Sequence, residues 1–139
     1  CIVEKKMTFW GFDLYHLKYR IDTKDNEHLT LTYLRDITKK NNVEKADEKF
    51  KANNKMTDAL QKQLDIWHSK YHNVTPNDIF EIFVDHDKSI SRSVFNGKEL
   101  MTLTGTDFAH KYLNIWAGED SVDDNVKDMI LKARKNVKR

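Results

Sequence analysis

Three side chains on one predicted strand have the residue types that best fit a binding or acid–base site. Tyr15, His16 and Tyr19 lie on the predicted strand 12–21, in which the alternation of apolar and polar residues slips between Leu14 and Leu17. Such a slip predicts a β-bulge or bend, and irregular strand positions are frequent beside ligand sites. An imidazole and a phenol could exchange protons with a ligand there. The simpler interpretation, which we favour, is that Tyr15 and Tyr19 are half-buried aromatic residues of a sheet.

Other histidines carry metal-ligand or base chemistry but fit ordinary roles better. His68 and His72 stand four residues apart on a predicted helix, a spacing that zinc sites use. No acidic residue lies between them, and we expect both imidazoles to face solvent beside the apolar stripe. Residues 85–87, Asp-His-Asp, form a polar turn that needs no cation, and His110 falls off the apolar stripe of its helix. We therefore predict neither a metal site nor a cofactor.

The charge balance gives no reason to expect nucleic acid as a partner. The 139 residues carry 24 basic and 22 acidic side chains, for a net charge of +2 at pH 7, whereas nucleic-acid-binding domains usually concentrate positive charge. Basic residues gather near the C-terminus, where we expect a solvated helix end that complements the helix dipole. They are Lys132, Arg134, Lys135, Lys138 and Arg139. The sequence has no run of about 18 apolar residues, so no membrane-spanning helix is predicted.

The beginning of the chain predicts that a leader preceded it. The first residue is Cys1 rather than Met, and residue 2 already belongs to a predicted strand. Cys1 is the one cysteine in the sequence, so an intrachain disulfide cannot form. The sequence makes no prediction of the oligomeric state.

Apolar periodicity predicts a single α+β domain over residues 1–139. Asn96-Gly97 favours a type I′ hairpin turn, because that turn needs positive φ at both positions. Residues 79–84 show no polar face, which predicts the central and best-buried strand. The order βββ-αα-βββ-αα predicts an antiparallel sheet of about six strands with helices on one face. The expected strands are 1–10, 12–21, 28–34, 79–84, 90–96 and 98–103, and the expected helices are 43–52, 56–72, 108–116 and one from 121.

Four segments, in this order, resemble those of the bacterial chalcone isomerase-like proteins. They are Gly11-Phe12-Asp13-Leu14-Tyr15, Tyr33-Leu34-Arg35-Asp36-Ile37, Phe95-Asn96-Gly97-Lys98 and Asn114-Ile115-Trp116-Ala117. The resemblance implies the chalcone isomerase fold, an open-faced β-sandwich with a helical layer, which agrees with the element order. Bacterial relatives usually carry an export signal, so the resemblance also implies a periplasmic or secreted protein.

The resemblance does not extend to the catalytic residues of plant chalcone isomerase. Those enzymes use an arginine on the first strand, whereas this strand offers Lys5 and Lys6. The position of their strand threonine falls at His16. The positions of their helix tyrosine, lysine and asparagine fall near Lys55, Asp58 and Lys62. Electrostatic stabilisation of a developing anion is usually the largest catalytic contribution, so we carry over no catalytic residue.

The resulting prediction is a non-catalytic protein that binds a small hydrophobic or fatty-acid-type ligand between sheet and helices. Lys5 or Lys6 would meet a carboxylate, above an apolar slot. The slot would be lined by Phe9, Phe12, Leu14, Trp67 and Phe108. The full set of predicted ligand-binding residues is Lys5, Lys6, Tyr15, His16, Trp67 and Phe108. Two alternatives stay open: an intramolecular lyase with a rearranged site that uses His16 and Tyr15, and an envelope protein that binds a partner and no small ligand.

Overall fold

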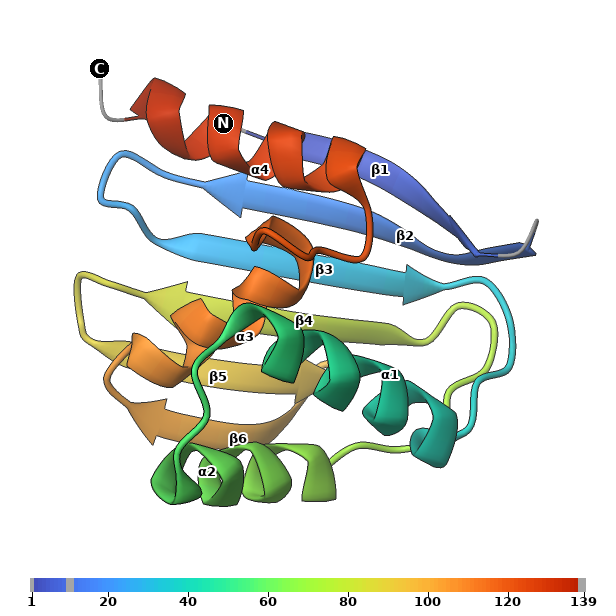
Figure 1. The fold of residues 1–139 in the computed structure, drawn as a ribbon. Coiled ribbons are helices and arrows are strands. Elements are labelled where there is room, and N and C mark those ends of the chain that lie inside the picture. Colours follow the sequence, from blue (N-terminus) through green and yellow to red (C-terminus); the bar gives the residue numbers. More distant parts are fainter. Residues whose placement is uncertain (1, 10–11, 138–139) are drawn as a thin grey trace.

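The computed structural model describes residues 2–9 and 12–137, with side chains from residue 14 to residue 137. It has the predicted α+β architecture, a six-stranded antiparallel sheet with helices packed on one face (Figure 1). The strands are β1 (Ile2–Phe9), β2 (Phe12–Ile21), β3 (Glu27–Tyr33), β4 (Ile79–Asp85), β5 (Ile90–Phe95) and β6 (Lys98–Thr104). The helices are α1 (Lys39–Asn53), α2 (Asp58–Ser69), α3 (Asp107–Ala117) and α4 (Asp124–Val137). None of the described helices is long and apolar enough to cross a lipid bilayer.

The sheet is a meander in which the strands lie in chain order, β1-β2-β3-β4-β5-β6. The predicted hairpin turn is confirmed, since Asn96 and Gly97 both have positive φ, 50° and 79°. The predicted irregularity in β2 falls at Leu14. Met7 pairs with Tyr15 and the next residue of β1 already pairs with Asp13, so Leu14 is the extra residue.

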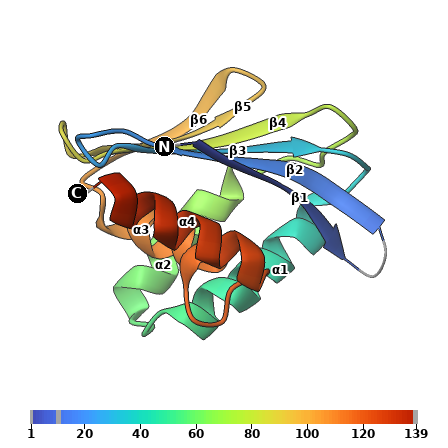
Figure 2. The same ribbon diagram turned by 90° about the horizontal axis from the view of Figure 1, so that it is seen from above.

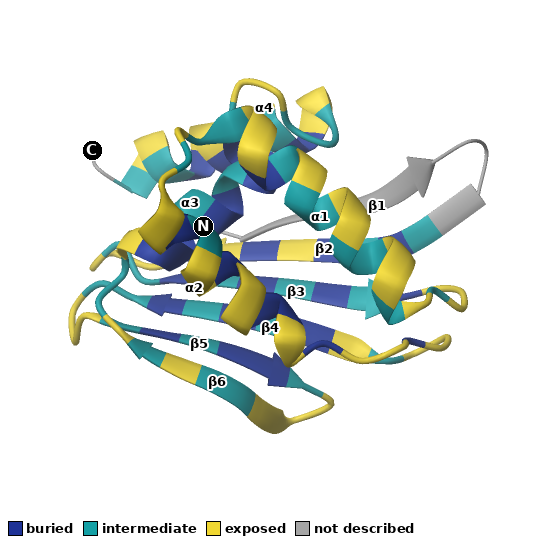
Figure 3. Ribbon diagram, turned by 60° about the horizontal axis from the view of Figure 1, so that its bottom comes forward, coloured by how far each residue is buried: buried dark blue, intermediate teal, exposed yellow. Residues whose placement is uncertain are grey.

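The helices cover one face of the sheet, and the other face is open in the described part of the chain (Figure 2). Buried side chains follow the covered face, alternating with more exposed ones along the strands (Figure 3). β4 lies between β3 and β5, as predicted for a central strand. However, it is buried on one face alone: Phe80, Ile82 and Val84 are buried, whereas Ile79 is 37% exposed. The sequence pattern was misleading because Phe83, on the open face, is apolar.

Capping residues set the helix starts differently from the expected bounds. α1 begins at Lys39 rather than residue 43, because Thr38 Oγ1 accepts a hydrogen bond from the Asn41 N–H at 3.1 Å. α4 begins at Asp124 rather than residue 121. Its cap is Asp123, whose Oδ1 accepts hydrogen bonds from two backbone N–H groups of the first turn at 2.8 and 3.0 Å.

Candidate ligand-binding cleft

A cleft of about 430 Å³ opens between the start of β2, the length of α1 and the end of α3. This volume falls within the range of about 300–1,000 Å³ that is usual for small-molecule sites. Most of its lining is apolar. The lining residues are Leu14, Tyr15, Ile37, Asn41, Asn42, Lys45, Ala46, Lys49, Ile115, Trp116 and Val122. A hydrophobic chain would therefore find matching surface on β2, α1 and α3.

One hydroxyl in the cleft is held as a hydrogen-bond donor. Tyr15 Oη accepts a hydrogen bond from Trp116 Nε1–H at 2.9 Å, and no described residue accepts the proton of Tyr15 itself. Burial is the main cause that raises the pKa of Tyr15 well above its ordinary value, so the phenol keeps its proton. The ring also packs edge-on against Tyr33, with centroids 5.7 Å apart. Tyr15 can thus donate one hydrogen bond to a ligand.

Two lysines of α1 give the cleft its positive charge. Lys45 and Lys49 both line it from one side of the helix. Lys49 Nζ lies 3.4 Å from Asp120 Oδ1, and the Lys49 side chain is 18% exposed. Lys45 Nζ lies 3.5 Å from Glu48 Oε2 on the helix surface. An ammonium beside an apolar cavity favours a ligand with an acidic head and a hydrophobic tail.

The packing of α1 explains why these lysines face the cleft. Phe50 is buried, and Val43 and Ala46 pack against the core as the predicted stripe. Lys45 and Lys49 lie beside that stripe at i, i+4, which places them one above the other on the same edge of the helix. The helix therefore presents apolar and cationic groups to one space.

Comparisons with known proteins agree with this architecture. The family model described as chalcone isomerase-like matches residues 16–132, which is most of the chain. The chain belongs to the chalcone isomerase-like family. Among solved structures it is similar to a fatty-acid binding protein from Arabidopsis thaliana, with a TM-score of 0.71 and 10% sequence identity over 98% of this chain and 87% of that one. A search of curated proteins found no match.

In this chalcone isomerase-like domain, the predicted site residues separate into different places. Tyr15 lines the cleft. His16 follows it on the strand and so projects to the open face of the sheet. Trp67 and Phe108 are 0% and 4% exposed, and their ring centroids lie 5.2 Å apart in the core. These two residues fill the core rather than line the cleft.

The remaining predicted groups lie outside the described side chains or away from the cleft. Lys5 and Lys6 pair with Leu17 and His16 in the β1–β2 register, but their side chains are not among those described, and the same is true of Phe9 and Phe12. The positions at residues 55, 58 and 62 stand before or on α2, and none of them lines the cleft. Sequence reasoning missed Lys45 and Lys49, whose signal was their spacing beside the stripe of α1.

A buried ionic cluster fixes α4 to the sheet, which corrects the expectation of a solvated basic helix end for Arg134, whereas Lys132 and Lys135 are exposed as expected. Arg134 Nη2 lies 2.8 Å from Glu27 Oε2 on β3, and Arg134 Nε donates to the same oxygen at 2.9 Å. Tyr19 donates to Glu27 Oε2 as well, and His86 Nε2 lies 3.1 Å from Glu27 Oε1. Burial alone would raise the pKa of Glu27, but Arg134 and the two hydrogen-bond partners offset this, and the net pKa is lowered. Glu27 therefore stays ionised.

A second buried polar chain corrects the expectation that His68 faces solvent. Trp67 Nε1–H donates to Tyr71 Oη at 2.9 Å, Tyr71 donates to Tyr112 Oη at 2.6 Å, and His68 Nε2 lies 2.8 Å from Tyr112 Oη. An indole N–H can donate but not accept, so Tyr71 receives the Trp67 proton and donates its own to Tyr112. The proton of Tyr112 has His68 Nε2 as its acceptor in the neutral tautomer that carries its hydrogen on Nδ1. Burial is the main cause that lowers the pKa of His68 to about 4.

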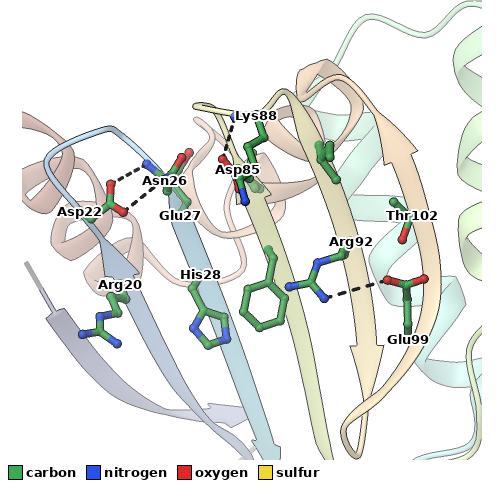
Figure 4. Close-up of a pocket in the computed structure, with 13 residues that line it drawn as sticks. Arg20, Asp22, Asn26, Glu27, His28, Asp85, Lys88, Arg92, Glu99 and Thr102 are labelled. Carbon is green, nitrogen blue, oxygen red and sulfur yellow. Dashed lines mark hydrogen bonds and ion pairs between the residues drawn. The ribbon is translucent and has the colours of Figure 1, made fainter.

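The open face of the sheet carries a hollow of about 590 Å³, larger than the cleft but built differently (Figure 4). A cross-strand row crosses it, in which His28, Phe83 and Arg92 pair on adjacent strands. Phe83 stacks on His28 at 4.1 Å between centroids, and the Arg92 guanidinium lies 4.5 Å from the Phe83 centroid. His28 Nε2 pairs with Glu81 at 2.7 Å, and Arg92 lies 4.0 Å from Glu99. Because most residues that line this hollow are charged or polar, whereas most of the cleft lining is apolar, we assign the site of a hydrophobic ligand to the cleft.

Proposed function

We propose that this domain binds a small amphipathic ligand of fatty-acid type in the cleft between β2, α1 and α3, without catalysing a reaction. The observation that carries the proposal is the apolar cavity of about 430 Å³ with Lys45 and Lys49 along one wall. The cavity suits a hydrocarbon chain, and the lysines suit an acidic head group. The similarity in fold to a fatty-acid binding protein supports the same ligand class.

The arrangement of the acid–base candidates supports binding rather than catalysis. A reaction through His16 and Tyr15 would need both side chains at one ligand, but adjacent residues of a strand project to opposite faces. Tyr15 is also unavailable as a general base, because burial raises its pKa and the phenol therefore stays protonated. The cleft retains hydrogen-bond donors and positive charge, which are enough to hold an anion.

Mass spectrometry of an organic extract of the purified protein, compared with a mock purification, tests for a ligand carried through purification. Calorimetric titration with dodecanoate then tests the site directly. Ala46→Trp fills the cleft and should abolish binding, whereas Ala52→Trp places the same side chain at an exposed position of α1 and should leave it unchanged. Thermal unfolding of both variants checks that they are folded.

Three results would contradict the proposal. The first is an empty extract together with no heat of binding for dodecanoate. The second is equal affinity in the two tryptophan variants, which would place the ligand elsewhere. The third is turnover of a chalcone by the wild-type protein, which would establish an enzyme.

A further inference from the structure

The connection between α3 and α4, residues 118–123, is tied to the end of α1 by one side-chain amide. Asn53 Oδ1 accepts a hydrogen bond from the Asp120 N–H at 2.7 Å, and Asn53 Nδ2 donates to the Asp120 carbonyl oxygen at 2.9 Å. A carboxamide can pair with the backbone N–H and C=O of one residue in this way because it has both a donor and an acceptor. Figure 2 shows the connection looping beside α1.

Gly118 allows the two elements to approach this closely. A Cβ at this position would overlap Asn53 Oδ1 and would lie 2.6 Å from the carbonyl oxygen of Asn114. The φ of Gly118 is −80°, which any residue can adopt. Space rather than backbone conformation therefore requires glycine here.

The same connection forms part of the cleft. Val122 lines the cavity, and its N–H donates to the carbonyl oxygen of Ile115, another lining residue, at 2.9 Å. From α1, Lys49 reaches Asp120, with Nζ 3.4 Å from Oδ1. Asp120 is largely exposed, whereas Lys49 is mostly buried. Asp120 thus engages one of the two cationic groups that the ligand head would need.

We propose that the connection 118–123 is a ligand-coupled strap over the cleft. Two carboxylates at one ammonium repel each other, so an acidic head group that pairs with Lys49 displaces Asp120. The strap is then held by Asn53, and opening of that amide pairing admits and releases the ligand. This inference rests on the proposed function of the cleft, and adds to it a competing internal anion and a gate.

The first test compares an acid with an alcohol of the same chain length. Asp120→Asn removes the competing charge at an exposed side chain, so the affinity for dodecanoate should rise about two- to fivefold, the factor that an exposed ion pair implies. The affinity for dodecanol should stay unchanged. Glu119→Gln, which makes the same charge change at an exposed neighbouring position, should shift neither ligand.

The second test measures the gate. Asn53→Ala removes the two hydrogen bonds to Asp120, together with the bond from Asn53 Nδ2 to the Lys49 carbonyl oxygen within α1. Stopped-flow mixing with a dansyl-labelled fatty acid should show association and dissociation rates that both rise, about thirtyfold for two bonds of usual net strength to the strap. The ratio of the rates should change much less. A purely structural role for Asn53 would lower affinity or stability without raising both rates.

The outcomes separate the strap from the site itself. If dodecanoate binds equally well to Asp120→Asn and Glu119→Gln, the competition is refuted. Unchanged rates in a folded Asn53→Ala variant refute the gate. If wild-type protein binds neither dodecanoate nor dodecanol, the proposed function fails and the strap fails with it. Should Asn53→Ala fail to fold, the comparison at Asp120 still decides the competition, and the same rate measurement on Asn53→Ser, whose shorter side chain cannot make both bonds, decides the gate.

Discussion

Between neutral pH and about pH 4, the fold should lose much less stability when His68 is replaced with glutamine. Burial lowers the pKa of His68 from 6.5 to about 4 in the folded protein. In the unfolded chain the imidazole takes up its proton near pH 6.5. As the pH falls through that value, the unfolded state binds a proton that the folded state does not, so the free energy of unfolding decreases until the pH is below about 4.

The hydrogen-bond chain explains why the folded protein resists this proton. A protonated His68 has an N–H at Nε2, which would face the O–H of Tyr112. Tyr112 would have to turn its proton toward Tyr71, which already receives the N–H of Trp67. Because Trp67 cannot accept, reversal leaves the Tyr71 proton without its present acceptor. This unfavourable contact, together with the lost hydration of the imidazolium, raises the free energy of the protonated His68 in the folded protein.

The size of the effect follows from the displacement of the pKa. A change from 6.5 to about 4 corresponds to about 3 kcal/mol, since each pH unit is worth about 1.36 kcal/mol. Domains of this kind have unfolding free energies of about 5–15 kcal/mol. Protonation linked to one buried imidazole therefore removes a substantial share of the unfolding free energy when the pH falls to about 4.

Urea unfolding at neutral pH and near pH 4 measures the effect. His68→Gln keeps an acceptor for Tyr112 but cannot titrate, so its loss of stability on acidification should be smaller than that of the wild type by about 2–3 kcal/mol. His72→Gln, which removes an exposed imidazole, controls for the loss of one histidine. Carboxylates titrate in all three proteins and cancel in the comparison. Equal losses in wild type and His68→Gln would refute the reasoning.

Other substitutions test the remaining features. Arg134→Met should lower the unfolding free energy by about 3–5 kcal/mol, because it leaves the Glu27 carboxylate buried without its cation. The double variant Arg134→Met with Glu27→Gln should lose less stability. Equal losses in the single and double variants, measured by urea unfolding, would contradict this. Gly118→Ala should cost about 1–3 kcal/mol, because the added methyl group has no room beside α1, and an unchanged melting temperature would show that the loop relaxes freely. Exchanging Lys45 and Lys49 for glutamine should lower the affinity for dodecanoate about tenfold, because two partly screened charges are lost. The affinity for dodecanol should not change. If calorimetry shows that the affinities for dodecanoate and dodecanol fall equally, the cause is a packing defect rather than the lost charge.

Local patterns in the sequence predicted most of the strands and helices and their order. Asn96-Gly97 predicts its turn from backbone conformation alone, and the apolar stripe through Leu60, Leu64 and Trp67 predicts the buried face of α2. These signals lie within a few residues of one another. They do not require knowledge of which elements meet, and so the strand and helix order could be predicted.

The features that could not be predicted depend on partners far along the chain. His68 stands one residue from Trp67, and it is buried because Tyr112 of α3 supplies a hydrogen-bond partner. Arg134 lies in a basic segment whose composition is typical of a solvated helix end, but its partner Glu27 lies far away in the sequence, on β3. The lysines of α1 look like ordinary surface charges until α3 and its connection to α4 pack beside them. In each case the side chain type was visible, and the pairing was not.

The meander has a consequence for how the chain folds. Among the strand pairings that the structure describes, β3 with β4 is the one that spans the helical segment 34–78. The entropic cost of closing a loop increases with loop length, so the β3–β4 pairing is slower to form than the short hairpins. The N-terminal and C-terminal three-stranded units can therefore form before they pair with each other. A chain that opens only between Leu31 and Phe80, which pair there, keeps both units and exposes two strand edges. Such edges readily accept a strand from another chain, so exchanged dimers and aggregates would start from this pairing.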